Sequence, residues 1–376
     1  MPTYTKLAPG DPAPVFHQRS FSNPRYAFDT AAGRYIVLCF FGSAARAHSQ
    51  AAIQAARSRR QFFDDTTASF FGVSLDPTDE REKRVFDSFP GYRYIWDFDA
   101  TASRLYGAFP LDAEARADQV VVHPTWVVLD PTLRVLKVIP FASNRGDIAS
   151  LLTYIDGLPP PSRFAGFELQ APILVLPNVF EPEFCQELIG LYQTHGGEES
   201  GVMREVDGRT VQVHDHAHKR RRDYTIENPA IVEKTQTLFN RRVVPQILKA
   251  HQFKITRMER YIVSCYAAED EAHFRAHRDN TTKGTAHRRF AVSVNLNDDF
   301  DGGEVSFPEY GPRSFKAPAG GAVVFSCSLL HAVSKITRGQ RFAFLPFLYD
   351  DEAAKIRAAN NAFLGGGVGE YKASVT

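Results

Sequence analysis

The sequence predicts two domains of different fold class, an α/β domain followed by a mainly-β domain with supporting helices. Short β-rich runs alternate with longer helical ones over residues 1–158, a pattern typical of βαβ units. Over residues 171–350 helical segments come first and strands follow, which favours an antiparallel sandwich or barrel. Three consecutive prolines at 159–161 stop the preceding helix and separate the two patterns. We therefore expect domains at 1–158 and 171–350, a proline-rich linker at 159–170, and a C-terminal helix with a flexible tail at 351–376.

Runs of β-branched and aromatic residues place the elements of the N-terminal domain. We expect a strand at 35–41, a helical segment through Arg60 and a second strand at 70–75. This alternation indicates a mostly parallel sheet covered by helices. The runs 125–130 and 133–138 are joined by a short Asp-Pro-Thr turn, which predicts a hairpin.

The C-terminal domain is expected to open with helices and to continue with strands. Apolar periodicity predicts helices at 182–192 and 229–249, and strands from 257 to 350. The glycines at 365–367 fall in the tail, which we expect to be frayed.

The composition excludes several classes of protein. The 376 residues include 44 Lys and Arg against 43 Asp and Glu, a net charge of +1, so no basic excess points to nucleic acid or to an anionic membrane. No uncharged apolar stretch approaches the ~18 residues of a membrane span, and residues 1–12 lack a signal pattern. The four cysteines are scattered singly, which predicts small buried residues in a reducing compartment. We therefore expect a cytoplasmic protein.

A candidate metal site begins with His277 and Asp279. In an extended segment these two side chains point to the same face, because strand side chains alternate. His331 lies at the end of a strongly apolar strand and is the candidate third ligand. Two histidines and a carboxylate bind one face of a ferrous ion and leave the opposite positions open. Zinc hydrolases use similar ligands, so this pattern leaves the metal open.

Arg341 follows His331 by ten residues and begins an apolar strand. A guanidinium in such a strand needs an anionic partner, because an unpaired buried charge is costly. A dicarboxylate cosubstrate would provide that partner. The nearby Arg338 falls in the preceding turn, so we favour Arg341, whose planar fork suits bidentate recognition of a carboxylate.

These residues, taken together, resemble the iron(II)/2-oxoglutarate dioxygenases, and within them the prolyl 4-hydroxylase-like group. The resemblance spans about 171–350 and includes the opening run 172–180, the His277 and Asp279 pair, the segment 301–307, His331 and Arg341. It implies a double-stranded β-helix, or jelly roll, with Fe(II) bound by His277, Asp279 and His331.

The same resemblance implies how the cosubstrate is held. Arg341 would hold the distal carboxylate of 2-oxoglutarate, and Tyr266 would hydrogen-bond this cosubstrate. Ser293 and Asn295 are alternate residues of the segment 289–297, so we expect both to face the pocket and to bind the cosubstrate.

The activity implied by the resemblance is that of a dioxygenase that uses Fe(II), 2-oxoglutarate and O2, with ascorbate as a further candidate cofactor. It would hydroxylate an unactivated C–H bond and release succinate and CO2. The substrate class stays open among a prolyl residue in a peptide, a free amino acid and a small metabolite, because variable loops select the substrate. The alternative is a non-catalytic binding or scaffold protein that retains a vestigial iron site.

The first half resembles a peroxiredoxin-like thioredoxin fold over about residues 6–158. The resemblance is carried by 10–14, 35–41, 73–76 and 123–126, and it implies a cis bond at Pro124. Peroxidase chemistry needs a thiolate of low pKa at the start of the helix after the first central strand. The run 41–49 has no cysteine, and Cys39 lies inside the strand. We therefore expect a non-catalytic domain that serves a homo-oligomer or a protein partner, with a thiol peroxidase as the less favoured alternative.

Two further segments call for interpretation. The run 214–224 is the densest mix of histidine and basic residues, and it fits a second metal site, a nucleic-acid patch, a substrate-binding loop or a solvated charged loop. We favour substrate contact, because the run lies between the helices and the metal-bearing strands. The run 287–289 is expected to support a strand start, and Gly302 and Gly303 to permit positive φ.

Overall fold

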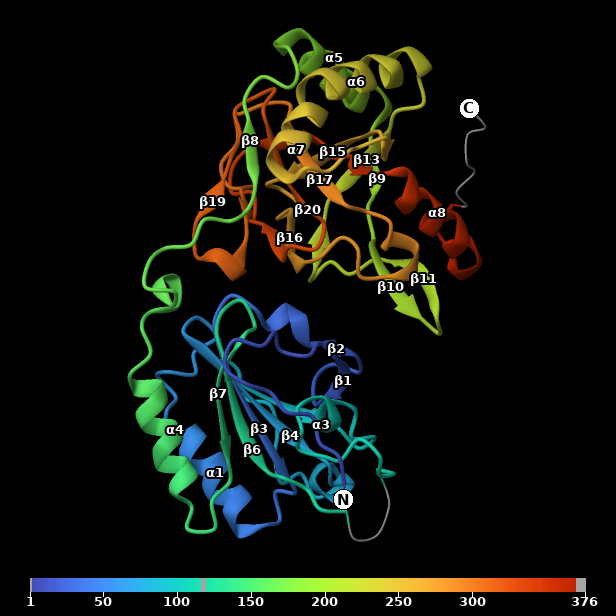
Figure 1. Cartoon of the computed structure of the whole chain (residues 1–376). Coiled ribbons are helices and arrows are strands. Elements are labelled where there is room, and N and C mark those ends of the chain that lie inside the picture. The colour runs from blue at the N-terminus through green and yellow to red at the C-terminus, as the bar shows by residue number, and fades with distance from the viewer. Residues whose placement is uncertain (1, 116–119, 370–376) are drawn as a thin grey trace. The chain divides into compact units, whose positions relative to one another are not determined.

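A computed structural model describes residues 2–115 and 120–369 of the chain (Figure 1). The chain divides into two compact units: the first is Met1–Gln170 with Pro308–Pro312, and the second is Ala171–Phe307 with Arg313–Thr376. Each unit has its own hydrophobic core. Among the described residues, no helix is both long enough and apolar enough to cross a membrane.

A seven-stranded sheet forms the centre of the first unit, in the order β2-β1-β5-β4-β3-β6-β7. Its strands are β1 (His17–Ser20), β2 (Tyr26–Ala27), β3 (Tyr35–Gly42), β4 (Ala68–Ser74), β5 (Tyr92–Trp96), β6 (Thr125–Leu129) and β7 (Val135–Pro140). Only the central strands β3, β4 and β5 pair in parallel. The antiparallel β6–β7 pair confirms the expected hairpin. The expected mostly parallel sheet is wrong, because this hairpin and the short β1 and β2 join by antiparallel pairing.

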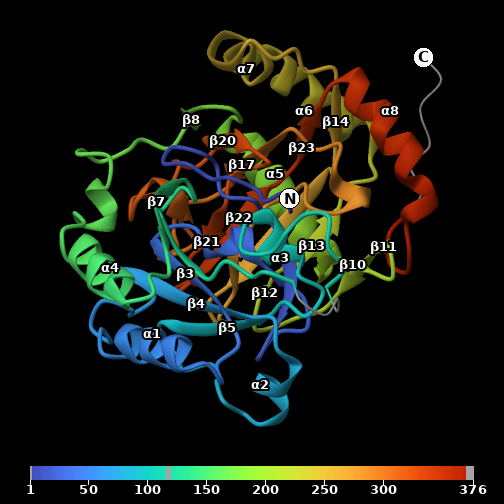
Figure 2. The same ribbon diagram turned by 60° about the horizontal axis from the view of Figure 1, so that its bottom comes forward.

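Helices cover both faces of this sheet. The helices are α1 (Ala47–Arg57), α2 (Pro77–Arg81), α3 (Thr101–Leu105) and α4 (Gly146–Asp156). Ile53 of α1 and Leu151 of α4 belong to the same core cluster, and Figures 1 and 2 show these two helices on one side of the sheet. On the opposite face Tyr106, directly after α3, stacks on Phe40. The cis peptide bond of the described residues is Phe89–Pro90, so the expected cis bond at Pro124 is wrong.

The second unit contains two large sheets. One follows the order β14-β23-β17-β22-β15-β13-β9 with β20 and β8 attached to β17, and the other follows the order β12-β16-β21-β18-β19. Antiparallel pairing holds both sheets together, which agrees with the mainly-β expectation. The strands are β8 (Leu174–Leu176), β9 (Glu198–Glu199), β10 (Val202–Val206), β11 (Arg209–Val213), β12 (Lys219–Arg220), β13 (Arg222–Thr225), β14 (Arg257–Glu259), β15 (Ile262–Ala267), β16 (His273–His277), β17 (Phe290–Asn295), β18 (Val305–Ser306), β19 (Ser314–Phe315), β20 (Ala322–Ser326), β21 (His331–Val333), β22 (Gln340–Phe344) and β23 (Phe347–Tyr349).

Strand alternation divides the larger sheet into a helix-packed face and an inner face. Val263 of β15 and Phe344 of β22 share a core cluster with residues of the helices, whereas Tyr266 of β15 packs in a separate cluster with Val333 of β21. Because β21 belongs to the smaller sheet, Tyr266 faces that sheet. Polar side chains on this inner face therefore lie between the two sheets.

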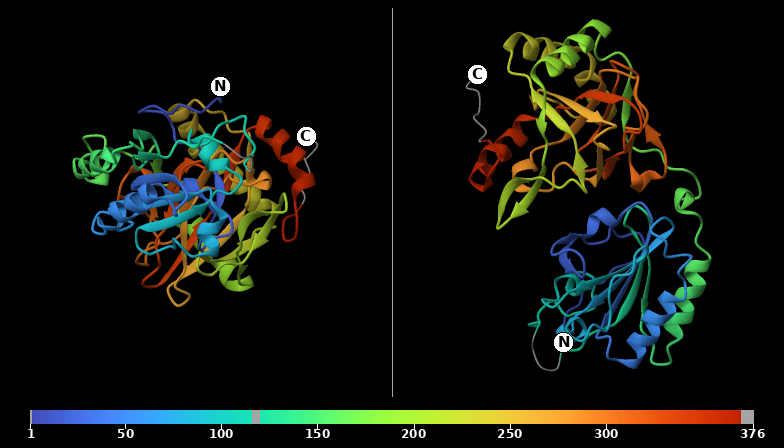
Figure 3. Two further views of the ribbon diagram at one scale, coloured as in Figure 1. Left: turned by 90° about the horizontal axis from the view of Figure 1, so that it is seen from below. Right: turned by 180° about the vertical axis from the view of Figure 1, so that it is seen from behind.

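Four helices support the second unit: α5 (Pro182–His195), α6 (Pro229–Arg242), α7 (Val244–His251) and α8 (Asp351–Ala359). The view from behind in Figure 3 shows α5 and α6 together at one end of the unit and α8 apart from them. The expected helix at 182–192 is confirmed as α5. The single helix expected at 229–249 is wrong, because α6 ends at Arg242 and α7 begins at Val244. Pro245 lacks the N–H that would continue α6 and lies in the first turn of α7.

The glycine run near the C-terminus is tied to a strand. The amide of Gly365 donates to the Thr210 carbonyl at 2.9 Å, and the amide of Gln212 donates to the Gly366 carbonyl at 3.2 Å. The expected frayed tail is therefore wrong for these glycines, since strand β11 holds them. Residues 370–376 of the expected tail lie outside the described residues.

Candidate metal centre and anion site

His277, Asp279 and His331 come together at the ends of two paired strands. His277 ends β16 and His331 begins β21, and the antiparallel register sets them opposite each other. The Nε2 atom of His277 lies 3.5 Å from Asp279 Oδ1, and that of His331 lies 3.4 Å from Asp279 Oδ2. One donor atom from each residue lies within 4.8 Å of the others, the sole such cluster within residues 2–115 and 120–369.

The backbone orients both imidazoles toward this common point. His277 Nδ1 donates to the Arg275 carbonyl at 2.7 Å, and His331 Nδ1 donates to the Leu329 carbonyl at 3.1 Å. A carbonyl can only accept, so each Nδ1 carries the hydrogen and each Nε2 keeps its lone pair for a metal. The amide of Asp279 donates to the Cys327 carbonyl at 2.9 Å, which fixes the backbone that carries the third donor.

The local electrostatics suit metal binding at neutral pH. Burial, and after it the neighbouring His331, lower the pKa of His277 to about 4. Burial opposes ionisation of Asp279, but His331 and His277 outweigh it and hold the pKa of the carboxyl below its usual value. The set therefore offers a neutral imidazole at His277 and an ionised carboxylate, the forms that coordinate a cation. The side chains of His277 and Asp279 are each 13% exposed, so the cluster reaches the surface.

Arg341 on β22 is a buried cation with neutral neighbours. Its side chain is 1% exposed, Nε donates to Asn295 Oδ1 at 2.9 Å, and Nη2 donates to Ser293 Oγ at 2.7 Å. Nη1 has no hydrogen-bond partner. Within the described parts of the chain Arg341 forms no ion pair, and burial lowers the pKa of its guanidinium. By contrast, Arg338 is exposed and pairs with Asp301.

Tyr266 lies beside Arg341 in the inner face of the large sheet. The two residues are opposite each other in the β15–β22 register, and the guanidinium carbon of Arg341 lies 5.2 Å from the centre of the Tyr266 ring. The hydroxyl of Tyr266 accepts a hydrogen bond from Arg221 Nη1 at 3.2 Å. Tyr266, Ser293, Asn295 and Arg341 thus form one polar group between the sheets.

The run 214–224, for which substrate contact was favoured, places Lys219, Arg221 and Asp223 near Tyr266 and His277, although the sequence singled out none of the three. Lys219 and Arg221 are buried, and burial lowers the pKa of Lys219 well below its usual value. Lys219 Nζ lies 4.9 Å from the centre of the Phe274 ring, which in turn stacks on His277 at 3.5 Å. A solvated loop over 214–224 is therefore wrong for this part of the run. The signal was the alternation of 219, 221 and 223, which in extended backbone puts three side chains on one side of the chain. Lys219 lies on β12, Asp223 lies on β13, and Arg221 joins the two strands.

The first part of that run stays at the surface. His214 and His216 are exposed and both contact Glu199. The expected supporting role of 287–289 agrees with the buried ion pairs that His287 and Arg288 form with Glu259. Gly302 and Gly303 have φ of +78° and +67°, as expected.

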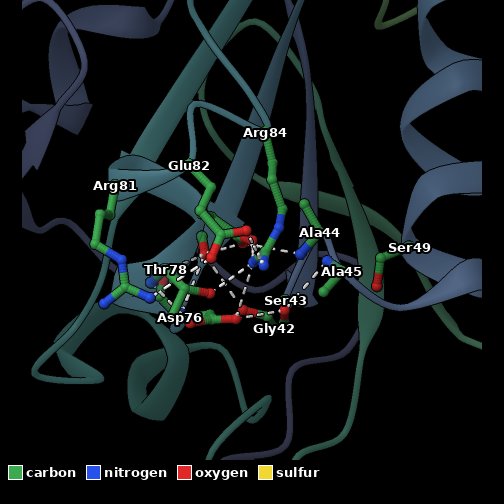
Figure 4. A network of polar contacts seen from close by, with 12 residues as sticks. Gly42, Ser43, Ala44, Ala45, Ser49, Asp76, Thr78, Arg81, Glu82 and Arg84 are labelled. Atoms are coloured by element: carbon green, nitrogen blue, oxygen red, sulfur yellow. Dashed lines mark hydrogen bonds and ion pairs between the residues drawn. The ribbon is translucent and has the colours of Figure 1, made fainter.

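The first unit offers no thiol at the position where a redoxin carries one. Strand β3 is followed by Ser43, whose hydroxyl donates to Asp76 at 2.6 Å, and by Ala44, whose amide donates to Asp79 at 2.8 Å (Figure 4). Arg84 donates to Asp79 at 2.8 Å, so the turn before α1 is held by a closed polar network. Cys39 is buried inside β3, and burial raises its pKa well above the usual value.

Comparison with known proteins matches the two units to different families. Residues 261–349 match the 2OG-Fe(II) oxygenase superfamily, and residues 9–138 match the AhpC/TSA family. A PKHD-type hydroxylase of Gluconobacter oxydans is 42% identical over 80 residues, and one of Paracoccus denitrificans is 43% identical over 79 residues. Each match covers 19% of this chain and 35% of the relative, so the chain spans about a third of the length of these hydroxylases.

Solved structures resemble each unit distantly. A prolyl hydroxylase from Trichoplax adhaerens, in complex with a hypoxia inducible factor peptide, is 16% identical with a TM-score of 0.37, over 50% of this chain and 87% of that one. The peroxidoxin BcpB of Mycobacterium tuberculosis is 21% identical with a TM-score of 0.35, over 41% of this chain and 99% of that one. Both scores are low, and neither likeness supports an inference about function.

The family matches agree with the architecture of both units. The matched segment 261–349 contains His277, Asp279, His331 and Arg341, and the matched segment 9–138 contains the sheet strands β1 to β6. Residues 261–349 are therefore a 2OG-Fe(II) oxygenase superfamily domain, and residues 9–138 are an AhpC/TSA, thioredoxin-like domain.

Proposed function

We propose that the protein is an Fe(II)/2-oxoglutarate-dependent dioxygenase that hydroxylates an unactivated C–H bond in a peptide or a small molecule. The observation that carries this proposal is the buried Arg341, whose Nη1 has no hydrogen-bond partner and whose guanidinium has no carboxylate partner among the described residues. A guanidinium kept in this state calls for an anionic ligand, because burial of an unpaired charge is costly. The same family domain holds a donor set suited to Fe(II), so one bound keto diacid would use both features.

His277 and His331 would hold Fe(II) through Nε2, and Asp279 would hold it through its carboxylate. Three donors on one side leave the remaining coordination positions open. When bound, Fe(II) and 2-oxoglutarate activate O2 for hydroxylation, and the cosubstrate leaves as succinate and CO2. Ascorbate is a further proposed cofactor that would keep the iron reduced.

Arg341 would hold the distal carboxylate of 2-oxoglutarate through its unclaimed Nη1–H. Ser293 and Asn295 accept its other hydrogen bonds and so fix the plane of the guanidinium. Because the fork is planar, fixing two nitrogens also fixes the direction of the third. Tyr266, beside Arg341, would donate its hydroxyl hydrogen to the same cosubstrate.

The proposed substrate is a prolyl residue in a peptide, a free amino acid or a small metabolite. A hydroxylated product is supported by the PKHD-type hydroxylases, to which the chain is 42% identical over 80 residues and 43% identical over 79 residues. A nucleic-acid partner is not proposed, because the net charge is only +1. We also propose a cytoplasmic location, since all four cysteines are buried and unpaired, which suits a reducing compartment.

For the first unit we propose a binding role, as an interface for a protein partner or for a second copy of the chain. This role is supported by the missing catalytic thiol, because Ser43 occupies the turn where a redoxin needs its thiol and Cys39 is buried. The family match of residues 9–138 then describes a fold without its usual chemistry.

The activity is tested by comparing a cell extract incubated with the wild-type protein, Fe(II) and 2-oxoglutarate with one incubated with the His277→Ala variant. The proposal expects succinate and a product heavier by one oxygen atom, in the wild-type sample only. Succinate at equal levels in both samples would exclude His277 from the reaction. No succinate from either sample would favour a scaffold protein with a vestigial iron site.

A further inference from the structure

Arg221 is a buried arginine that contacts the anion site directly. It is 6% exposed, and its Nη1 donates to the Tyr266 hydroxyl at 3.2 Å. Its Nη2 donates to Ser200 Oγ at 3.1 Å and to Asp223 Oδ2 at 2.7 Å. Its Nε is buried without a hydrogen-bond partner. Within the described residues, the Nε–H of Arg221 therefore has no acceptor.

The contact fixes the hydrogen of the Tyr266 hydroxyl. An arginine only donates hydrogen bonds, so the hydroxyl oxygen must accept in its contact with Arg221. Arg341, the other cation near the ring, also only donates, and the two guanidinium carbons lie 5.6 Å and 5.2 Å from the ring centre. No residue in the described parts of the chain accepts the hydroxyl hydrogen of Tyr266. This hydrogen must therefore point away from both cations.

Among the described residues, three buried hydrogen-bond donors around the Tyr266 ring thus have no acceptor. They are the Nε–H of Arg221, the Nη1–H of Arg341 and the hydroxyl hydrogen of Tyr266. Buried donors are nearly always satisfied, so an arrangement of three calls for a ligand that accepts hydrogen bonds.

The charges around the ring favour an anionic ligand. Asp223 is the carboxylate that pairs with Arg221, and it also pairs with Arg260 at 3.2 Å. Arg341 has no ion pair among the described residues. In the part of the chain that the structure describes, Arg221 and Arg260 therefore share one carboxylate and Arg341 has none, which leaves positive charge that a dianionic keto acid would neutralise.

We propose that Arg221 is a positioning residue that holds the Tyr266 hydroxyl as a donor to the anionic cosubstrate. This inference rests on the proposed 2-oxoglutarate site. Arg221 donates a hydrogen bond to the Tyr266 hydroxyl oxygen, so the hydroxyl hydrogen points at a carboxylate of the cosubstrate. Arg341 binds the same cosubstrate through Nη1. Without Arg221 the hydroxyl is free to rotate, and its hydrogen bond to the ligand is lost for part of the time.

The experiment is a double-mutant cycle on 2-oxoglutarate affinity, measured by calorimetry with Fe(II) under argon. Arg221→Gln and Tyr266→Phe are each expected to weaken binding about tenfold, the effect of one hydrogen bond to a charged group. If Arg221 acts through the hydroxyl, the double variant is expected to lose about tenfold as well, rather than about a hundredfold. Fe(II) binding without the cosubstrate is expected to be unchanged in all variants.

Arg222→Gln is the matched control, because Arg222 is the exposed neighbour on the same run, and its affinity is expected to equal that of the wild type. If Arg221→Gln unfolds below the assay temperature, Arg221→Lys replaces it in the cycle. Arg221→Lys is expected to lose less 2-oxoglutarate affinity, and this loss must also disappear in the Tyr266→Phe background. Wild-type affinity in the Arg221 variant, or losses that multiply in the double variant, would overturn the inference. Absence of 2-oxoglutarate binding in the wild type would instead overturn the proposed function.

Discussion

The buried guanidinium of Arg341 is the residue-scale feature that separates a ligand site from a structural ion pair. Arg288 is also poorly exposed, but its Nε donates to Glu259 at 2.9 Å, so its charge is balanced within the protein. Among residues 2–115 and 120–369, the hydrogen-bond partners of Arg341 are Ser293 and Asn295, and both are neutral. A cation placed in this way is stabilised when an anion binds.

Replacement of Arg341 by Ala is predicted to weaken 2-oxoglutarate binding by about 2–5 kcal/mol, because a buried charge partner of the ligand is lost. Fe(II) binding is expected to persist, since Arg341 makes no contact with the three metal donors. Calorimetric titration of each ligand measures both effects. Arg338→Ala is the control, because Arg338 is exposed and paired with Asp301. Wild-type affinity in the Arg341 variant would exclude the assigned role.

Replacement of His277 or Asp279 by Ala is predicted to abolish stoichiometric Fe(II) binding and coupled turnover, because two remaining donors hold the ion poorly. Metal analysis after anaerobic loading and desalting gives the occupancy. His273→Ala serves as the control, since His273 lies on the same strand and bonds the Glu271 carbonyl. Full occupancy in both ligand variants would mean that the metal lies elsewhere.

Residue spacing predicted much of the site. The inner side chains of the run 214–224 could not be predicted, because their burial depends on how the strands are placed. The two-residue spacing of His277 and Asp279 puts both side chains on one face, and an ordered sequence of motifs supplied His331 and Arg341. Substrate contact was favoured for the run 214–224, but Arg221 was not singled out, because five of the six residues at 218–223 are basic or histidine and composition alone does not show which of them point inward. The burial of Lys219 and Arg221 and the exposure of Arg222 distinguish the inner side chains, and this pattern is visible only once β12 and β13 are placed.

At the scale of elements, local patterns predicted strands and hairpins better than they predicted pairing. The run 35–41 and the hairpin of β6 and β7 formed as expected, because each has a continuous apolar or turn signal in the sequence. The antiparallel edges made by β1 and β2 were missed, because strands of four and two residues carry no periodicity. One long helix was expected where Pro245 divides α6 from α7.

Gly302→Ala is predicted to destabilise the second unit by about 2–4 kcal/mol, because strain at positive φ adds to a clash. A Cβ at Gly302, with φ of +78°, would lie 2.0 Å from the Lys335 carbonyl oxygen. Gly208 has φ of +75° and open space around it, so Gly208→Ala carries the backbone strain alone and is expected to cost about 1 kcal/mol. Urea unfolding measures both losses. If both variants lose the same unfolding free energy, the clash between the new Cβ of Gly302→Ala and Lys335 adds nothing to the backbone strain.

At the scale of the whole molecule, the chain joins an oxygenase domain to a thioredoxin-like domain that lacks its reactive thiol. The proline run and the change from alternating to segregated elements predicted two fold classes, and both are confirmed. The match of residues 9–138 to the AhpC/TSA family does not bring peroxidase chemistry with it, because that chemistry depends on one side chain rather than on the fold.

The folded protein is predicted to show no rapidly reacting thiol toward a disulfide reagent, because all four cysteines are buried. Burial also raises the pKa values of Cys39 and Cys327 well above the usual value and those of Cys185 and Cys265 to about 11, so little thiolate is present at neutral pH. Titration in guanidinium chloride should release all four thiols. A fast-reacting thiol in the native protein, lost in Cys39→Ser, would restore the thiol peroxidase alternative.

The central claim is that one site binds both Fe(II) and a keto diacid, and the visible spectrum of the anaerobic complex tests it most directly. The account predicts that 2-oxoglutarate added to the Fe(II)-loaded protein under argon produces a weak charge-transfer band that saturates at one cosubstrate per chain, and that air removes the band and releases succinate. The band should be absent in His277→Ala and should need far more 2-oxoglutarate in Arg341→Ala. A wild-type protein that binds Fe(II) yet shows neither band nor succinate would contradict the account.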